Sequence, residues 1–467
     1  MVSQVVSKIL GATLGKFPVR FNIAVMLFLG CMISYMLRVN FSMTLLAMVE
    51  APDAPDYGPR YAWDKSQQGL VLGAYFWGYM VSSLPGSMLV ERFGGKTITT
   101  YILALNTLIT ATAPLFASWG FAGIYISRFL TGFFSGPQYP AMHNLIAKWA
   151  PPDEKGKFVA TLLGGTFGTV ITWPILGVLI ENVGWSFGFY VPALITGVIC
   201  IMWYYIVAND PQSHSWITKD ELEHIEKSLG TSVAKVKPPL PIAKILTSVP
   251  YLALIVLHFG NMWGMFFLMT AAPKFMSEVL NFNLSKAGVL SALPYLARLI
   301  FGLTFGSIGD MVRKREWLSV TAIRKNFTIF SHILPGLFLA SLSLVDVPYA
   351  CVAIITISLA FNGAACITNL QNSHDLAPNF AGILYGIMNF VGTTAGFMSP
   401  LVVAHFTKDG NTLEDWRIIF IIGAIAYITP AIVFMIFGSG VTQSWNDGKK
   451  VVETIEGQEK QDGEKNA

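Results

Sequence analysis

Two arginines lie inside apolar stretches of this chain, where a permanent positive charge is costly. Arg38 lies within the stretch 20–48, and Arg128 lies in residues 115–147, which hold no other Lys, Arg, Asp or Glu. Arginines in such stretches almost always face a cavity or a partner. Because no Asp or Glu lies in the apolar cores, both guanidinium forks facing one cavity would bind a carboxylate or a phosphate. Alternatively, each arginine bonds to backbone carbonyls and holds helices together.

The sequence contains no motif of the common enzyme or metal-binding classes. The sequence lacks the nucleophile motif G-x-S-x-G, the Walker phosphate loop and the zinc motif H-E-x-x-H, so an enzyme is not expected. The cysteines lie in apolar segments without metal-ligand spacing, which favours packing roles. We therefore expect neither a metal nor another cofactor. The cysteines are Cys31, Cys200, Cys351 and Cys366.

The composition is that of a membrane protein. Of 467 residues, 53% are hydrophobic and 12% are charged, about half the charged share of soluble proteins. A helix that crosses a membrane needs about 20 mostly apolar residues. This rule predicts twelve spans, at 20–48, 67–90, 98–118, 121–147, 158–182, 186–208, 249–276, 286–308, 327–344, 348–372, 381–405 and 416–438.

The longest polar interval separates six spans from six. We predict an all-α membrane protein of twelve transmembrane helices in two six-helix halves, with kinks at Pro140 and Pro174. The predicted parts are an N-terminus (1–19), a first half (20–208), a central link (209–248), a second half (249–438) and a disordered tail (439–467).

The central link carries a helix signal of its own. Residues 218–229 read TKDELEHIEKSL, which opens with a capping box from Thr218 to Glu221 and spaces apolar residues along one face. This pattern predicts a surface helix beside the membrane.

Basic residues predict the orientation in the membrane. Lysines and arginines gather in the N-terminus, the central link and the loops after the second, fourth and eighth spans. By the positive-inside rule these segments and both termini are cytoplasmic. A glycosylation sequon at Asn283 then lies on the outer side, close to the eighth span. The plasma membrane and an endolysosomal or vesicular membrane both stay open.

Corresponding loops of the two halves share a charge pattern. SMLVERFGGK (87–96) follows the second span and GSIGDMVRKR (306–315) follows the eighth, each with an acid at its fifth position and basic residues behind it. This parallel repeat favours a transporter with a substrate site between its halves. The gating residues predicted from these loops are Glu91, Arg92, Lys96, Asp310 and Arg313.

Longer phrases resemble one transporter family. They are YMLRVNFSM (35–43), GAYFWGYMVSSLPGSMLVERFGGK (73–96), YPAMHNLIAKWAPPDEKGK (139–157), GTVITWPILG (168–177), LSALPYLAR (290–298) and DLAPNFAGILYGIMN (375–389). Together they are similar to the anion:cation symporter family of the major facilitator superfamily, which includes sialin, the vesicular glutamate transporters and the type I sodium–phosphate cotransporters. The resemblance implies the major facilitator fold and transport of an anion.

The resemblance also implies roles for single positions. It supports substrate binding by Arg38 and Arg128, to which we add Asn40, beside Arg38, and Asn389, which matches a position in the eleventh span. Vesicular glutamate transporters carry an arginine where this chain has Asn261, which disfavours vesicular glutamate loading.

Ser135 stands where proton-coupled members of the family carry a glutamate. A hydroxyl does not titrate, so we expect coupling to Na⁺, for which backbone and side-chain oxygens are suitable ligands. His143 matches a family histidine and is the alternative coupling group, because histidine titrates near neutrality. A structural hydrogen-bonding role for His143 is equally consistent with the sequence.

These observations predict a secondary active transporter that moves inorganic phosphate or a small organic anion by alternating access, with Na⁺ as the driving ion. The alternatives are a proton-coupled organic-anion carrier that uses His143, and an anion channel. The expected partners are the small anion and the lipid bilayer, without nucleic acid, and the expected functional unit is a monomer.

Overall fold

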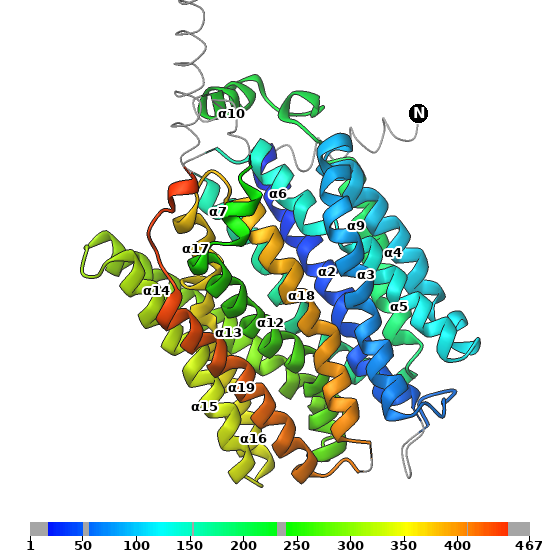
Figure 1. Cartoon of the computed structure of the whole chain (residues 1–467). Helices are drawn as coiled ribbons and strands as arrows, with labels where there is room; N and C mark the ends of the chain where they lie inside the picture. Colours follow the sequence, from blue (N-terminus) through cyan, green and yellow to red (C-terminus); the bar gives the residue numbers. More distant parts are fainter. Residues whose placement is uncertain (1–16, 50–55, 152–153, 231–239, 409, 447–467) are drawn as a thin grey trace, which may run out of the picture.

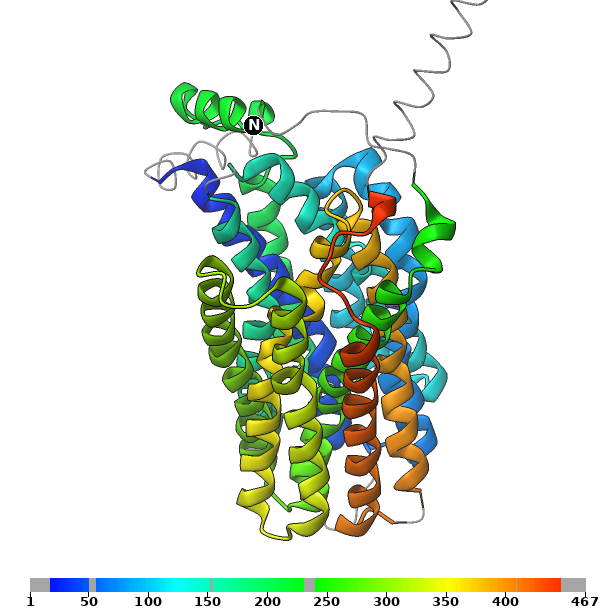
Figure 2. The same cartoon turned by 60° about the vertical axis from the view of Figure 1, so that its left-hand side comes forward.

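The computed structural model describes residues 17–49, 56–151, 154–230, 240–408 and 410–446. These residues form long helices that run side by side between two ends of the molecule (Figures 1 and 2). The helix α10 (Lys219–Gly230) of the central link lies across one end, which we call the link end. The opposite end, which carries the loops between α2 and α3 and between α18 and α19, is the far end.

The first half runs from α2 to α9. Its helices are α2 (Val19–Met48), α3 (Lys65–Phe93), α4 (Gly95–Ser118), α5 (Phe121–Ser135), α6 (Gln138–Trp149), α7 (Lys155–Ala160), α8 (Gly164–Val183) and α9 (Phe187–Ile206).

After α10 and the short α11 (Ile242–Leu246), the second half runs from α12 to α19. Its helices are α12 (Val249–Lys274), α13 (Leu284–Lys314), α14 (Val320–Thr328), α15 (Leu334–Ser341), α16 (Pro348–Asn362), α17 (Asn369–Leu376), α18 (Ala381–Phe406) and α19 (Leu413–Phe437).

The twelve predicted spans correspond to these helices. Ten continuous helical stretches of the described chain are long and apolar enough to cross a membrane. The second span, α3, has 29 residues but a more polar sequence. The fourth span is divided into α5 and α6, of 15 and 12 residues. The described residues therefore hold all twelve spans of an all-α membrane protein.

The fourth span breaks one turn earlier than predicted. The sequence predicts a kink at Pro140, but the helix stops at Ser135 and restarts at Gln138, with Gly136 and Pro137 between. A methyl group added at Gly136 would lie 2.0 Å from Ser82 Oγ, so only glycine permits this approach to α3, and Pro137 brings no N–H to the hydrogen-bond ladder. In the fifth span α8 continues through Pro174.

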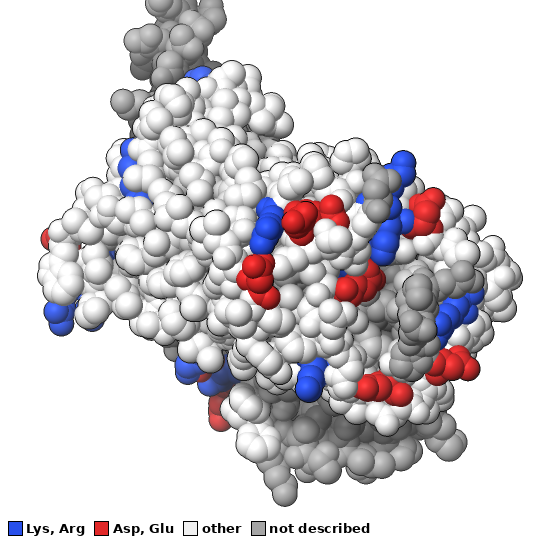
Figure 3. All heavy atoms as spheres, turned by 90° about the horizontal axis from the view of Figure 1, so that it is seen from below, with Lys and Arg blue, Asp and Glu red and all other residues white. Residues whose placement is uncertain are grey.

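The two halves are joined at the far end. The Lys65 ammonium on α3 forms an ion pair of 3.1 Å with Glu278 beyond α12. Trp77 on α3 stacks on Phe397 of α18, with ring centroids 3.9 Å apart. On the other side of the bundle, Glu181 of α8 accepts a hydrogen bond from the backbone N–H of Ser285. Figure 3 looks onto this end and shows basic side chains beside acidic ones.

At the link end the same helices stand apart. Near the start of α18, a methyl group added at Gly382 or Gly386 would meet no atom within 4 Å. Near the end of α3, the Met88 side chain is 73% exposed. The close contacts described between the halves therefore lie toward the far end, while these positions at the link end meet no neighbour.

Close backbone contact between α8 and α13 maintains the far-end closure and gives a first prediction. A methyl group added at Gly288 would lie 2.4 Å from the carbonyl oxygen of Trp173. Gly288→Val is therefore expected to force the far end open. In that case Thr270→Cys, which places a thiol behind the closure, should react faster with an impermeant thiol reagent added from the far side. Gly382→Val is the matched control, because it meets no neighbour in this conformation. Equal labelling in both variants would contradict the steric account.

The central link is fastened to the start of α2. Residue Pro18 offers no side-chain cap to this helix. Instead Glu221 of α10 accepts hydrogen bonds from the backbone N–H groups of Val19 and Arg20, both of 3.0 Å. The predicted capping box is thus only half formed: Thr218 Oγ1 accepts from the Glu221 N–H, while the carboxylate caps another helix. The link helix packs on the first half of the protein.

A histidine anchors the beginning of the same link. His214 Nε2 lies 3.0 Å from the carbonyl oxygen of Ile206 at the end of α9, and its ring packs edge-on against Trp149. Burial lowers the pKa of His214 below its ordinary value. A neutral ring therefore fastens the link to the last helix of the first half.

Candidate functional site

Arg38 lies about two thirds of the way along α2, between the two halves. Its guanidinium carbon is 4.6 Å from the ring centroid of Tyr35, 5.2 Å from Tyr75 and 4.9 Å from Tyr79. Phe266 of α12 in the second half approaches the same group at 5.6 Å. The residue is only 7% exposed. Aromatic faces stabilise a cation in such a cage.

The hydrogen-bonding capacity of Arg38 is not used up by the protein. Its Nε has no hydrogen-bond partner among the described residues, and the ion pairs found there do not include Arg38. A buried charge without a counter-ion is costly. An anion bound between the halves would supply both the missing charge and the missing acceptors.

Arg128 has a different environment, on α5. Its Nη1 donates to the carbonyl oxygen of Leu37 at 3.1 Å and to Asn40 Oδ1 at 3.3 Å. Its Nη2 donates to the carbonyl oxygen of Arg38 at 3.1 Å. In this conformation Arg128 therefore fastens α5 to the backbone of α2 at Leu37 and Arg38. This contact fits the helix-holding alternative, but the Arg128 Nε has no hydrogen-bond partner among the described residues, so its role in substrate binding stays a prediction.

The two predicted asparagines lie apart. Asn40 forms one cluster with Arg38 and Arg128, which we call the arginine cluster. Its Oδ1 accepts from Arg128, and its Nδ2 lies 3.4 Å from the carbonyl oxygen of Gly188. Asn389 lies on α18 in the second half, half-buried, one turn before Gly392. A methyl group added at Gly392 would lie 3.0 Å from the ring of His258, so Asn389 belongs to a second polar region.

The predicted coupling residues occupy contrasting places. Ser135 is 1% exposed; its hydroxyl accepts from Asn106 Nδ2 at 3.1 Å and donates to the carbonyl oxygen of Thr131 at 2.7 Å. Ser135 thus ties α5 to α4. His143 is exposed on α6 near the link end, away from the arginine cluster.

Sequence reasoning missed a buried polar network in the second half. His258 is fully buried, and its Nδ1 lies 2.9 Å from Asn369 Nδ2. Asn362 accepts from Arg298 Nε at 2.9 Å and donates to Asn261 at 3.0 Å. Each residue type is common as packing in apolar helices, so only their convergence indicates a site, and that requires the fold.

This arrangement agrees with what the chain resembles. Residues 27–400 match the model of the Major Facilitator Superfamily. This chain belongs to that superfamily. It is 33% identical to sialin of Ovis aries over 450 residues, which cover 91% of this chain and 90% of that protein. It is also 33% identical over 460 residues to a Drosophila melanogaster protein named for inorganic phosphate cotransport, covering 92% and 87%.

Further relatives and solved structures agree. The chain is 31% identical to human vesicular glutamate transporter 2 over 447 residues, or 93% of this chain and 77% of that protein. A bacterial homologue of the human lysosomal transporter Spinster, solved in an inward-facing and occupied conformation, superposes with a TM-score of 0.67 at 12% identity, covering 90% of this chain and 97% of that one. The chain is a multi-pass membrane transporter, not an enzyme.

The predicted gating loops of this superfamily member are exposed. Glu91, Arg92, Asp310 and Arg313 all lie on the surface at the link end. The Lys96 ammonium lies 5.0 Å from the ring of Tyr204 in its own half. The gating role of these residues stays a prediction.

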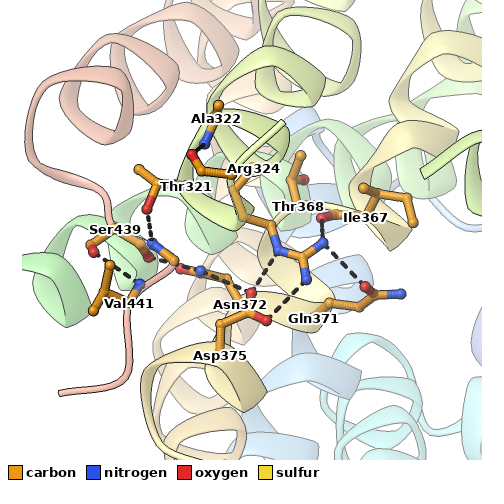
Figure 4. A network of polar contacts seen from close by, with 12 residues as sticks. Thr321, Ala322, Arg324, Ile367, Thr368, Gln371, Asn372, Asp375, Ser439 and Val441 are labelled. Atoms are coloured by element: carbon orange, nitrogen blue, oxygen red, sulfur yellow. Dashed lines mark hydrogen bonds and ion pairs between the residues drawn. The ribbon is translucent and has the colours of Figure 1, made fainter. Parts of the chain in front are cut away.

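A buried ion pair at the link end was not predicted. Arg324 of α14 donates from Nε to Asp375 Oδ2 at 2.6 Å and from Nη2 to Oδ1 at 3.1 Å (Figure 4). Its Nη1 donates to the carbonyl oxygen of Ile367. The two side chains are 2% and 6% exposed. This bidentate pair joins the ninth and tenth spans.

The same cluster holds the beginning of the predicted tail. The backbone N–H of Gly440 donates to Thr321 Oγ1 at 2.9 Å, and Asn372 Nδ2 donates to the carbonyl oxygen of Ser439 at 2.9 Å (Figure 4). Residues 439–446 therefore pack on the second half, so the prediction of disorder from Ser439 begins too early. Residues 447–467 lie outside the described residues.

The side chain of Asn283, the sequon residue, is engaged in hydrogen bonds within the protein. Its Oδ1 accepts from the N–H of Lys286 and caps α13, while its Nδ2 donates to Glu181 Oε1 at 3.2 Å. A glycan on this amide would disturb the far-end closure, which makes glycosylation in this conformation unfavourable.

Proposed function

We propose that this protein is a secondary active transporter that carries a small anion across the membrane by alternating access. The observation that carries the proposal is Arg38: a buried guanidinium between the two halves, surrounded by aromatic rings and without a counter-ion among the described residues. The contacts that join the two halves toward the far end support a carrier over a channel, because a channel needs a path open at both ends.

The proposed substrate is inorganic phosphate or a small organic anion. A guanidinium fork suits phosphate and carboxylate equally. Sialin and the relatives named for phosphate and glutamate transport are similar to this chain to nearly the same degree, between 31% and 33%, so identity favours none of them. Uptake of labelled phosphate and of a panel of organic anions by purified protein in liposomes tests the proposal. No saturable uptake of any anion would sink it.

We place the link end in the cytoplasm, because the basic residues of the loops and the central link gather there. The described conformation is then inward-open. The transporter acts as a monomer, in the plasma membrane or in an endolysosomal or vesicular membrane.

Na⁺ is the proposed driving ion. Ser135 offers a hydroxyl, already hydrogen-bonded to Asn106 and Thr131, where a proton-coupled transporter needs a titratable group. The arginine cluster contains no carboxylate to take a proton. Proton coupling through the exposed His143 is the competing mechanism.

Separate gradients distinguish the two mechanisms. We expect proteoliposomes to accumulate the anion when an inward Na⁺ gradient is imposed, and to accumulate little under a pH gradient alone. Ser135→Glu should introduce a pH dependence, because burial in an apolar site raises a carboxyl pKa toward neutrality. Ser135→Gln is the control of matched size. Strong accumulation by the wild type in Na⁺-free medium, lost in His143→Gln, would establish the proton mechanism instead.

A further inference from the structure

A buried lysine lies in the far-end closure. Lys274 is the last residue of α12 and is 7% exposed. Its Nζ has one hydrogen-bond contact with a described residue, Gln68 Oε1 of α3, at 3.5 Å. An ammonium group has three donors, so this lysine is poorly satisfied where it lies. Burying a charge is costly unless it is paired and hydrogen-bonded.

The charges around Lys274 do not balance. Lys65 of α3 pairs with Glu278 at 3.1 Å, and the same carboxylate oxygen accepts from Asn411 Nδ2 at 2.6 Å. Glu278 is the acidic member of this group, and Lys65 and Lys274 are its two cations. This group of three side chains therefore carries one excess positive charge.

The group surrounds a small cavity on the far-end side of Arg38. The cavity has a volume of ≈ 20 Å³, and its polar lining comes from Ser42, Lys65, Gln68, Thr270, Lys274 and Glu278. Space of this size holds about one water molecule. Ser42 lies one turn beyond Arg38 on α2. Lys274 lies eight residues beyond Phe266, which contacts Arg38, or about 12 Å along α12.

The backbone at Lys274 is also irregular. The α-helix gives way to a π-helix over Phe275–Val279 immediately after it. Single π-helical turns occur frequently at functional sites. This turn carries Glu278, so it sets the position of the carboxylate relative to both lysines.

We infer that Lys274 and Lys65 form an outer anion-capture site, which receives the anion from the far side before it reaches Arg38. The inference rests on the proposed anion transport. When the far end opens, α3 separates from α12, which parts Lys65 from Glu278 and Lys274 from Gln68. Lys65, Lys274 and Glu278 at the opened far end together still carry one excess positive charge, which attracts an anion. On closure Glu278 returns to Lys65 and displaces the anion toward Arg38.

The test is the apparent KM for anion entering from the far side, measured with protein of known orientation in liposomes. Lys274→Gln is expected to raise this KM about tenfold, the effect of roughly 1.4 kcal/mol, and to weaken its dependence on ionic strength. Lys274→Arg should stay near the wild type. Glu278→Gln adds a net positive charge, so it should lower the KM while loosening the closure. Lys286→Gln, which removes an exposed far-end lysine outside the cavity, is the matched control.

Two further measurements make the outcome decisive. The KM for anion entering from the link end should change little in Lys274→Gln; an equal rise from both sides would overturn the capture role. Replacing chloride with gluconate separates two sources of the anion: if the effect of Lys274→Gln disappears without chloride, the captured ion is chloride and not the substrate. An unchanged far-side KM in folded Lys274→Gln, with wild-type uptake intact, overturns the inference alone. Absence of uptake by the wild type would instead overturn the proposed function.

Discussion

Replacing Arg38 with glutamine is expected to reduce anion uptake by about a hundredfold or more, with the protein still folded in its membrane. A buried charge pair broken on one side costs about 2–5 kcal/mol, and each 1.4 kcal/mol is about tenfold in affinity. Arg38→Lys should recover part of the activity, because a lysine keeps the charge but lacks the planar fork.

The aromatic cage explains why folding should survive. Arg38 is held by ring faces, and losing cation–π contacts costs about 0.5–2 kcal/mol. Arg128 is the contrasting case, because Arg128→Gln removes three hydrogen bonds to α2. That variant should lose thermal stability as well as uptake.

Uptake in proteoliposomes and thermal unfolding in detergent, measured together for both variants, check this difference. Near wild-type uptake by Arg38→Gln would remove the substrate site assigned to the aromatic cage. A fall in unfolding temperature as large as that of Arg128→Gln would show that Arg38 is structural.

The spans were predictable because a membrane imposes a length on apolar segments. The halves, the central link and the helix within it follow from the same rule and from the polar intervals. The break at Gly136 and Pro137 was placed one turn too late, at Pro140, because the sequence does not show which residue approaches α3.

The sequence could not show which residues contact each other in the folded protein. The role of Arg128 in substrate binding stays a prediction, but the sequence did not show that it donates to backbone carbonyls of α2, which every residue type provides equally. Glu221 was expected to cap its own helix but caps α2, 202 residues away from Val19. The burial of Lys274 at the end of α12 was equally hidden, because its contact with Gln68 of α3 comes from the packing of the two halves.

The ion pair between Arg324 and Asp375 shows the same limit. Arg324 appeared as one of several basic residues near the repeated loop, and Asp375 as part of a family phrase. Both lie at the ends of predicted spans, so each could equally have been a solvated surface charge. Only the packing of the ninth span against the tenth makes them a buried pair.

Asp375→Ala is therefore expected to destabilise the second half by about 3–5 kcal/mol, because it leaves the guanidinium of Arg324 buried without its partner. The pair is bidentate, both side chains are almost fully buried, and the adjoining cluster also holds Ser439 and Gly440. The loss should appear as a lower unfolding temperature of the purified protein in detergent.

An exposed ion pair of equal length provides the control. Arg417 and Asp346 also lie 2.6 Å apart, but their side chains are 33% and 70% exposed, and such pairs contribute about 0–1 kcal/mol. Asp346→Ala should therefore leave the unfolding temperature almost unchanged.

Removing both charges of the buried pair with Arg324→Met and Asp375→Leu should recover much of the loss, since the larger part of the cost is the stranded charge and not the missing attraction. If Asp375→Ala proved as mild as Asp346→Ala, water would have to reach Arg324, and the cluster that joins the ninth span, the tenth span and residues 439–446 would be looser than its hydrogen bonds indicate.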